Sequence, residues 1–349
     1  VVLFEIENGQ YLHYTNHYCI VRKDILIHVK KALPKPTIIF DTYWKFAFER
    51  QNIFFKRLEC PQDYPWTKDD VLRNYKFTNA YRASDRVSQY LISDVIQKGG
   101  QKNEEVFFRI ILFKLFNKIE TWQYLNDKIG EIRYSNFDFK LFSDTLEQAR
   151  SKGLPIYSNA YIMASAKSFF NYKNKHQNHL RLLEKMMQDN LPDVINKCNG
   201  MKEAYEKLLE YPGIGTFLAY QYITDINYSE ITNFSEMEFV KAGPGAKDGI
   251  RKCFSDPGNY SEEDIIKMVC ENQESEFNRL GLNFKDLWGR RLQLIDCQNL
   301  FCEVDKYSRA IHPEFIGSSN RTRIKQKFKP TSITPIKYTF PKKWKLEVD

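Results

Sequence analysis

The segment Pro212-Gly213-Ile214-Gly215 joins two stretches of helical periodicity, and its residues suit the binding of a phosphate group. Both glycines permit positive φ and the close approach of another backbone. The N–H groups of Gly213, Ile214, Gly215 and Thr216 lie where the second helix begins, and such groups have no partner within a helix, so they can hold an anion. The alternative is an ordinary tight turn between two helices.

This hairpin resembles the helix-hairpin-helix of DNA repair glycosylases, which holds the DNA backbone without reading its sequence. The resemblance implies a catalytic carboxylate downstream, at the start of a later helix. There, Ser235 and Glu238 match a capping box, which leaves Glu236 as the first candidate and Glu238 as the second. Such a carboxylate would stabilise a cationic sugar or activate the attacking water. The alternative is a pair of acids that complement the helix dipole.

Two further polar segments and a second glycine-rich helix start are candidate contacts to a nucleotide. The side chains that can hydrogen-bond or stack on a base are Asn79, Tyr81, Arg82, Asp85, Gln298, Asn299 and Glu303. Gly243 and Gly245 open another helix and, like the hairpin, are candidates for binding the DNA backbone. The alternative for each segment is a buried polar network that only supports the fold.

Glycosylases of this type that also cut the strand carry a lysine just after the hairpin, where this sequence has Thr216 and Phe217. The resemblance therefore implies a monofunctional enzyme that releases the base through water. We predict no metal and no cofactor, because the cysteines lack cluster spacing and His176 and His179 have no neighbouring cysteine or paired carboxylate. Both histidines are expected on a helix surface.

Several motifs together resemble the α-glutamyl/putrescinyl-thymine pyrophosphorylase family, which also supplies the helical domain of hydroxymethyluracil DNA kinases. The resemblance covers roughly residues 40–310, and its motifs are Thr42–Phe46, Glu49–Gln51, Pro65–Asp69, Phe77–Arg82, Asp85–Gln89, the Pro-Gly-Ile-Gly hairpin, Ala242–Gly245 and Asp296–Tyr307. A bacterial anti-phage glycosylase that removes glucosylated hydroxymethylcytosine is also similar. No G-x-x-x-x-G-K-[ST] motif is present, so the kinase half is not expected here.

The resemblance implies a monofunctional DNA glycosylase that flips and excises a bulky hypermodified pyrimidine, best matched by α-glucosyl-hydroxymethylcytosine, in anti-phage defence. Tyr81 would stack on the base, and the product would be an abasic site. The expected partner is double-stranded DNA carrying modified bases. Two alternatives stay open: a transferase or pyrophosphorylase in thymine hypermodification, and a non-catalytic sensor of modified DNA.

The elements that must position these residues are mostly helices. We predict a mainly α fold with a helix-hairpin-helix glycosylase-like core over residues 41–310, a β-containing extension over 1–40 with a turn at Asn8-Gly9, and a basic arm over 311–349. The predicted helices are 84–97, 103–116, 137–151, 156–170, 174–187, 189–198, 201–211, 216–226, 236–241, 246–254, 261–280 and 284–306.

Composition and charge agree with a globular DNA-binding protein. The 349 residues carry a net charge of +8, and nine basic residues against three acidic ones lie after residue 310. A basic segment suits a polyanionic partner, although it can equally serve as a solvated arm. The apolar runs are too short to span a membrane, and seven cysteines without C-x-x-C spacing favour a reducing cytoplasm.

Overall fold

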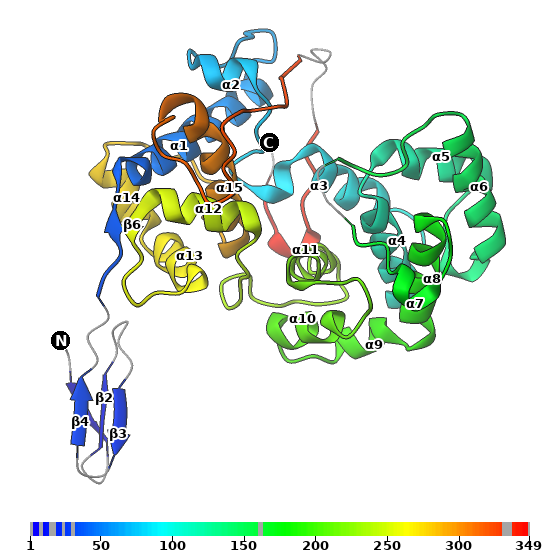
Figure 1. The fold of residues 1–349 in the computed structure, drawn as a ribbon, viewed down its shortest axis with the longest axis horizontal. Coiled ribbons are helices and arrows are strands. Elements are labelled where there is room, and N and C mark those ends of the chain that lie inside the picture. The colour runs from blue at the N-terminus through cyan, green and yellow to red at the C-terminus, as the bar shows by residue number, and fades with distance from the viewer. Residues whose placement is uncertain are drawn as a thin grey trace.

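The structure is a computed structural model that describes residues 3–6, 10–13, 19–22, 25–28, 32–159, 163–329 and 337–347. The prediction of a mainly helical chain is confirmed (Figure 1). The helices are α1 (Ile38–Glu59), α2 (Asp70–Asn74), α3 (Arg86–Tyr90), α4 (Asn103–Phe116), α5 (Ile119–Ile129), α6 (Phe139–Ser151), α7 (Lys167–Phe170), α8 (Lys175–Gln188), α9 (Leu191–Asn196), α10 (Met201–Leu209), α11 (Thr216–Ile226), α12 (Pro244–Cys253), α13 (Glu262–Glu271), α14 (Gln273–Arg279) and α15 (Leu294–Ile311). Short 3-10 turns are η1 (Arg82–Ser84), η3 (Tyr134–Asn136) and η4 (Lys342–Trp344), and η2 (Leu91–Ile96) is a π-helix.

The strands are short and pair only in twos within the described residues. Antiparallel pairs join β1 (Leu3–Ile6) to β2 (Gln10–His13) and β3 (Cys19–Arg22) to β4 (Ile25–His28). Both pairs lie within residues 1–40, for which a β-containing extension is predicted, while the predicted turn at Asn8-Gly9 lies outside the described residues. β5 (Lys35–Pro36) pairs with β6 (Phe254–Asp256), which fastens the chain before α1 to the end of α12.

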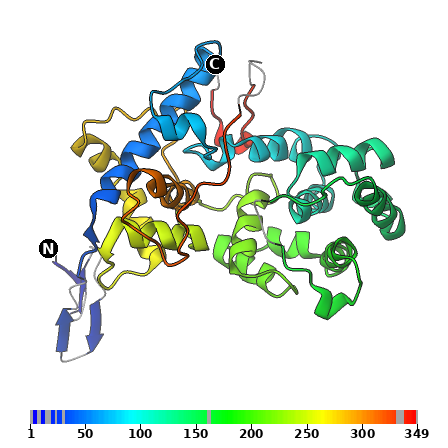
Figure 2. The same cartoon turned by 45° about the horizontal axis from the view of Figure 1, so that its top comes forward.

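The helices form two groups that both views show side by side (Figures 1 and 2). In the first group, which we call the α15 lobe, α15 contacts α1, α12 and α13. In the second, the α4 lobe, α4 contacts η2, α5, α8, α9 and α11. The α12–α15 contact is especially close, because a Cβ added at Gly249 would lie 2.1 Å from the carbonyl oxygen of Phe301.

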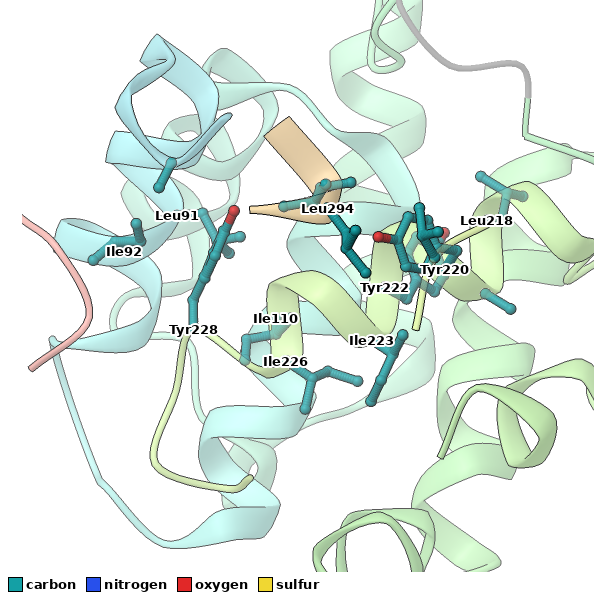
Figure 3. Close-up of a cluster of buried hydrophobic side chains, with 14 of the residues drawn as sticks. Leu91, Ile92, Ile110, Leu218, Tyr220, Tyr222, Ile223, Ile226, Tyr228 and Leu294 are labelled. Carbon is teal, nitrogen blue, oxygen red and sulfur yellow. The ribbon is translucent and has the colours of Figure 1, made fainter. Parts of the chain in front are cut away.

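The core runs between the two lobes along α11. Leu218, Tyr220, Tyr222 and Ile226 of this helix are buried, and Figure 3 shows them in one cluster with Leu91 and Ile92 of η2 and Ile110 of α4. Leu294, at the start of α15, is part of the same cluster, so the α15 lobe contributes to this core. Burial of such aliphatic and aromatic side chains supplies the main free energy that holds α11 in place.

Residues 337–347, which we call the tail, contact both lobes. The Tyr338 ring lies 4.8 Å from that of Phe54 on α1, centroid to centroid. The backbone N–H of Thr339 donates to the side-chain oxygen of Gln89 on α3 at 2.8 Å. Lys343 Nζ donates to the carbonyl oxygen of Ser229 at 2.9 Å. This part of the basic arm therefore packs on the body.

Two predicted helices begin later in the structure, at Lys167 and Leu294. In the range predicted as 156–170, the described residues 156–159 and 163–166 are not helical, and Lys167–Phe170 is a short helix between Ala166 and Asn171, which are both in left-handed conformation. The last predicted helix begins at Leu294 and not at Phe284, because the Phe284 ring stacks on Phe277 at 4.2 Å and the following residues turn through a Leu287–Arg290 bridge. At the second of these helices tertiary contacts outweigh local helical periodicity.

Candidate functional site

A cleft of about 920 Å³ lies between α3 and α4 on one side and α12 and α15 on the other. Nine lysines and arginines and three acidic residues line it. The basic residues are Lys76, Arg82, Arg86, Lys114, Lys306, Arg309, Arg321, Arg323 and Lys325, and the acids are Asp85, Glu303 and Asp305. A cleft with this excess of positive charge favours an anionic ligand.

One wall of the cleft is the loop at residues 77–79, which the side chain of Arg50 binds. The buried guanidinium of Arg50 donates to the carbonyl oxygen of Thr78 and to Asn79 Oδ1, both at 2.9 Å. Held in this way, the loop directs two consecutive backbone N–H groups at carboxylates. The Thr78 N–H donates to Glu303 at 3.1 Å, and the Asn79 N–H donates to Asp85 at 2.8 Å. Two carboxylates are thereby fixed side by side in a basic cleft.

Asp85 and Glu303 differ in their electrostatic surroundings. The pKa of Asp85 is raised to about 7, chiefly by burial and also by the charge of Glu303, against the opposing effect of the Asn79 N–H. Glu303 accepts a hydrogen bond from Lys306 Nζ at 2.7 Å. A carboxylate that titrates near neutral pH in a cleft is suited to accept a proton from a ligand hydroxyl.

A buried ion group forms the floor of the cleft. Asp225 on α11 accepts from Arg82 Nη1 at 2.7 Å and lies 3.0 Å from Lys114 Nζ on α4. Burial acts to raise the pKa of Asp225, but the two cations outweigh it and hold the pKa below its ordinary value. Arg82 also donates to the Tyr228 hydroxyl at 3.1 Å. The group fixes Arg82 between the two lobes.

The starts of α11 and α12 meet beside the cleft. Gly213 has φ of +80° in the turn, and the next residues of the hairpin, Gly215 and Thr216, are exposed at the start of α11, while Ile214 is buried. A Cβ added at Gly243 would lie 2.9 Å from the Phe217 ring, so the two helix starts are in contact. Gly245 lines the cleft itself. The structure thus brings both predicted backbone-binding segments together.

Glu236 and Glu238 lie outside the cleft, and the predicted helix 236–241 is wrong. Residues 236–238 form a turn, because the preceding loop is fixed by Asn227, whose side chain bonds the backbone of Phe234 at both its N–H and its carbonyl. Glu236 is 9% exposed and pairs with Arg290 at 2.7 Å. Burial raises the pKa of Glu236, with Arg290 opposing. Glu238 is exposed.

The remaining predicted pocket residues divide between the cleft and the interior. Arg82, Asp85, Asn299 and Glu303 line the cleft. Tyr81 is buried, and its hydroxyl donates to the carbonyl oxygen of Arg290 at 2.7 Å. Gln298 is buried and donates to Cys302 Sγ at 3.2 Å. Asn79 contributes its backbone N–H to Asp85, while its side chain is bound by Arg50.

Sequence reasoning missed Lys114 and Asp225. Lys114 lies in an otherwise apolar run near the end of α4, and Asp225 lies in the apolar helix α11. Charged side chains in fully buried helices must be paired. Opposite charges in two apolar helices were therefore a usable signal of the ion group on the cleft floor.

The two histidines considered as metal ligands are buried, so the prediction that they lie on the surface is wrong. His179 lies between the Tyr157 hydroxyl at 3.0 Å and the carbonyl oxygen of Ala164 at 2.7 Å, and burial lowers its pKa to about 4. Among the described residues there is no group of three or more metal-ligating side chains. In the same residues, no helix is both long and apolar enough to cross a membrane.

Comparison with known proteins identifies the family. Residues 37–317 match the family model of the helical domain of 5-hmdU DNA kinase. The chain is 30% identical over 289 residues to the 5-hmdU DNA kinase of Bacillus phage SP10, which covers 77% of this chain and 45% of the phage protein. The chain thus spans about half the length of the curated relative it matches. No solved structure matches it.

These matches confirm the predicted hydroxymethyluracil DNA kinase family, and they overturn the prediction of a DNA glycosylase. A kinase transfers a phosphoryl group, whereas a glycosylase hydrolyses the bond to a base. The hairpin could not distinguish the two, because free N–H groups at a helix start bind phosphate whichever reaction follows. Glu236, the carboxylate predicted to act in base release, forms an ion pair with Arg290. The chain belongs to the family of the 5-hmdU DNA kinase helical domain.

Proposed function

We propose that this chain is the DNA-holding part of a transferase that acts in thymine hypermodification, and that its substrate is DNA containing 5-hydroxymethyluracil. The observation that carries the proposal is the pair Asp85 and Glu303 in a strongly basic cleft, within the region that matches the kinase family. The positive charges of the cleft alone would suit any DNA. The two carboxylates add acceptors for a hydroxyl group, which distinguishes 5-hydroxymethyluracil from thymine.

The size of the cleft fits a nucleotide that has left the DNA stack. Its volume of about 920 Å³ lies near the upper end of the range of roughly 300–1,000 Å³ for small-molecule sites. Enzymes that act on a base within a duplex extrude it into such a pocket. The basic lining residues would then neutralise the phosphates on either side of the extruded nucleotide.

The hairpin would hold the DNA backbone beside the cleft. In this proposal α10, the turn and α11 form a helix-hairpin-helix, and the N–H groups of Gly213 to Thr216 bind a phosphate. The contact between Phe217 and Gly243 supports a shared surface with the start of α12. These contacts position the strand and carry no base information.

In the transfer step, the hydroxymethyl oxygen would attack the terminal phosphorus of a nucleoside triphosphate, and a nucleoside diphosphate would leave. Asp85 would accept the hydroxyl proton, since its pKa of about 7 lets it be largely unprotonated at slightly alkaline pH. Glu303, held by Lys306 and Thr78, would orient the hydroxyl. This chain would supply the DNA side of the reaction.

Binding of matched duplexes tests the proposal. Fluorescence anisotropy would compare a duplex with one 5-hydroxymethyluracil and the same duplex with thymine. A hydrogen bond to a charged group is worth about 1.5–3 kcal/mol, so we expect roughly a tenfold to hundredfold preference for the modified duplex. The variants Asp85→Asn and Glu303→Gln should lose most of it, while the exposed control Asp127→Asn should keep it.

Equal affinity for the two duplexes would refute the proposal. A preference that is present, together with no transfer of label from γ-labelled ATP to the DNA when the kinase half is supplied with this chain, would favour the sensing alternative instead. Binding by this chain alone and transfer in the combined reaction separate these outcomes.

A further inference from the structure

Residues 321–329 alternate strictly between basic and other side chains. The odd positions, which we call the basic strip, are Arg321, Arg323, Lys325, Lys327 and Lys329, and the even positions are Thr322, Ile324, Gln326 and Phe328. Alternation with a period of two puts successive odd residues on one side of an extended chain. The segment precedes the tail and belongs to neither lobe.

Backbone hydrogen bonds pair the end of this segment, at Gln326 to Phe328, with residues 74–76 at the end of α2. Lys327 forms an antiparallel bridge with Tyr75, just after α2. The Lys76 N–H donates to the carbonyl oxygen of Gln326 at 3.0 Å, and the Phe328 N–H donates to that of Asn74 at 2.8 Å. The position of the segment is therefore set by the body.

Partly buried side chains occur only on the even side of the segment, where Thr322 and Gln326 are exposed. Ile324 and Phe328, both at even positions, are partly buried, and the Phe328 ring lies 6.3 Å from that of Tyr64. All five residues of the basic strip are exposed. Arg321, Arg323 and Lys325 also line the cleft. The strip thus runs from the cleft outward over the surface.

The charges of the basic strip are not compensated by acids within the described parts of the chain. No ion pair of 4.0 Å or less joins any of the five to a carboxylate there. Exposed lysines elsewhere often have such a partner, as Lys140 has Asp144 at 2.6 Å and Lys185 has Asp189 at 2.8 Å. Five unpaired charges held in a row are costly unless a polyanion neutralises them.

We propose that the basic strip binds the phosphates of one DNA strand, next to the nucleotide in the cleft. Residues two apart in an extended chain are about 6.6 Å apart, and successive phosphates of one DNA strand, which rise about 3.4 Å along the axis and also rotate around it, are separated by a distance of the same order. A regular row of phosphates therefore matches a regular row of cations. The location beside an extruded nucleotide rests on the proposed function, whereas the binding of phosphates does not.

The salt dependence of binding measures the contacts directly. Each phosphate neutralised contributes about 0.9 to the slope of log affinity against log salt on duplex DNA. Replacing all five residues of the strip by glutamine should therefore flatten the slope by up to about 4.5. The probe is an unmodified duplex of two to three turns, measured by anisotropy across a series of salt concentrations.

Two control variants separate a specific strip from general charge. The first replaces by glutamine five exposed basic residues of the α4 lobe: Lys128, Arg133, Lys140, Arg150 and Lys173. This variant loses the same number of positive charges far from the strip. Its slope of log affinity against log salt should change by less than about 1, because long-range charge effects are screened. The second exchanges Arg321 with Thr322 and Lys325 with Gln326, so that the net charge is unchanged but two cations move to the other side.

The exchanged variant should lose about 1.8 of the slope, since two contacts are displaced. A slope of the exchanged variant equal to that of the unaltered protein, or equal loss in the strip variant and the α4-lobe control, would overturn the proposal. Preference for 5-hydroxymethyluracil should be the same in all of these variants. If the slope falls as expected while no such preference exists, the strip stands and the proposed function fails.

Discussion

Replacing Asp85 by asparagine would remove a negative charge in the cleft that lowers the free energy of unfolding. The pKa of this carboxyl rises from 3.8 to about 7 in the folded protein, chiefly because of burial. Since one pKa unit is worth about 1.36 kcal/mol, the charged form is disfavoured in the fold by roughly 4 kcal/mol. The amide of asparagine has the same shape, and its oxygen can still accept from the Asn79 N–H.

The sign of the pH dependence follows from where the proton binds more tightly. Asp85 binds it more tightly in the folded state than in the unfolded chain, so its favourable contribution is complete below pH 3.8 and is lost as the pH rises through about 7. The asparagine variant lacks this dependence. We therefore expect Asp85→Asn to be more stable than the unaltered protein by up to roughly 4 kcal/mol at pH 8, and equally stable near pH 4.

Urea denaturation of both proteins at pH 4, 6 and 8 measures this difference. Asp127→Asn, at an exposed position of α5, is the matched control and should change stability by less than about 0.5 kcal/mol. A stability difference that is the same at all three values, or a variant that is less stable at pH 8, would refute the reasoning. A gain in stability with a loss of binding preference is the pattern of a residue retained for function.

Three other substitutions, with Gly215→Ala as a control, test the packing of the fold. Asp225→Asn should destabilise the fold by about 3–5 kcal/mol in chemical denaturation, because it leaves two buried cations without their carboxylate. Burial lowers the pKa of His179 to about 4, so the stability that its neutral form contributes is complete above pH 6.5 and is lost as the pH falls toward 4. The drop in melting temperature from pH 7 to pH 5 should therefore be smaller in His179→Gln than in the unaltered protein. Gly249→Ala should prevent close packing of α12 on α15, since its Cβ would clash with the carbonyl of Phe301, and should lower the melting temperature by many degrees; Gly215→Ala, with no atom within 4 Å of the added Cβ, should leave it unchanged.

The sequence predicted the fold best where local and tertiary preferences agree. The helices at 103–116 and 216–226 have the predicted bounds, because an apolar run there coincides with burial. The helix expected at Glu236 is absent because Asn227 and Arg290, one before and one far after it in the chain, bind that segment. Arg290 lies 54 residues from Glu236 in the chain, so this contact leaves no local pattern.

The candidate site was predicted in part for the same reason. Asp85 and Glu303 were singled out as polar residues in motifs, and the fold does bring them together in the cleft. Tyr81 carries the same kind of signal but is buried, and periodicity could not show on which side of its loop it lies. Phosphate-binding geometry, in turn, does not define a reaction, which is why a correct family resemblance led to the wrong chemistry.

The contacts of the tail have a consequence for the kinetics of DNA binding. Tyr338 contacts α1 and Thr339 contacts α3, so the tail links the lobes on either side of the cleft. A protein whose halves are already joined need not close on its ligand, and its association then resembles rigid-body docking. The slow event is then in the DNA, because a paired base must leave the stack to enter. Association should therefore be faster with a mismatched 5-hydroxymethyluracil than with a paired one, and its rate would report the opening of the base pair.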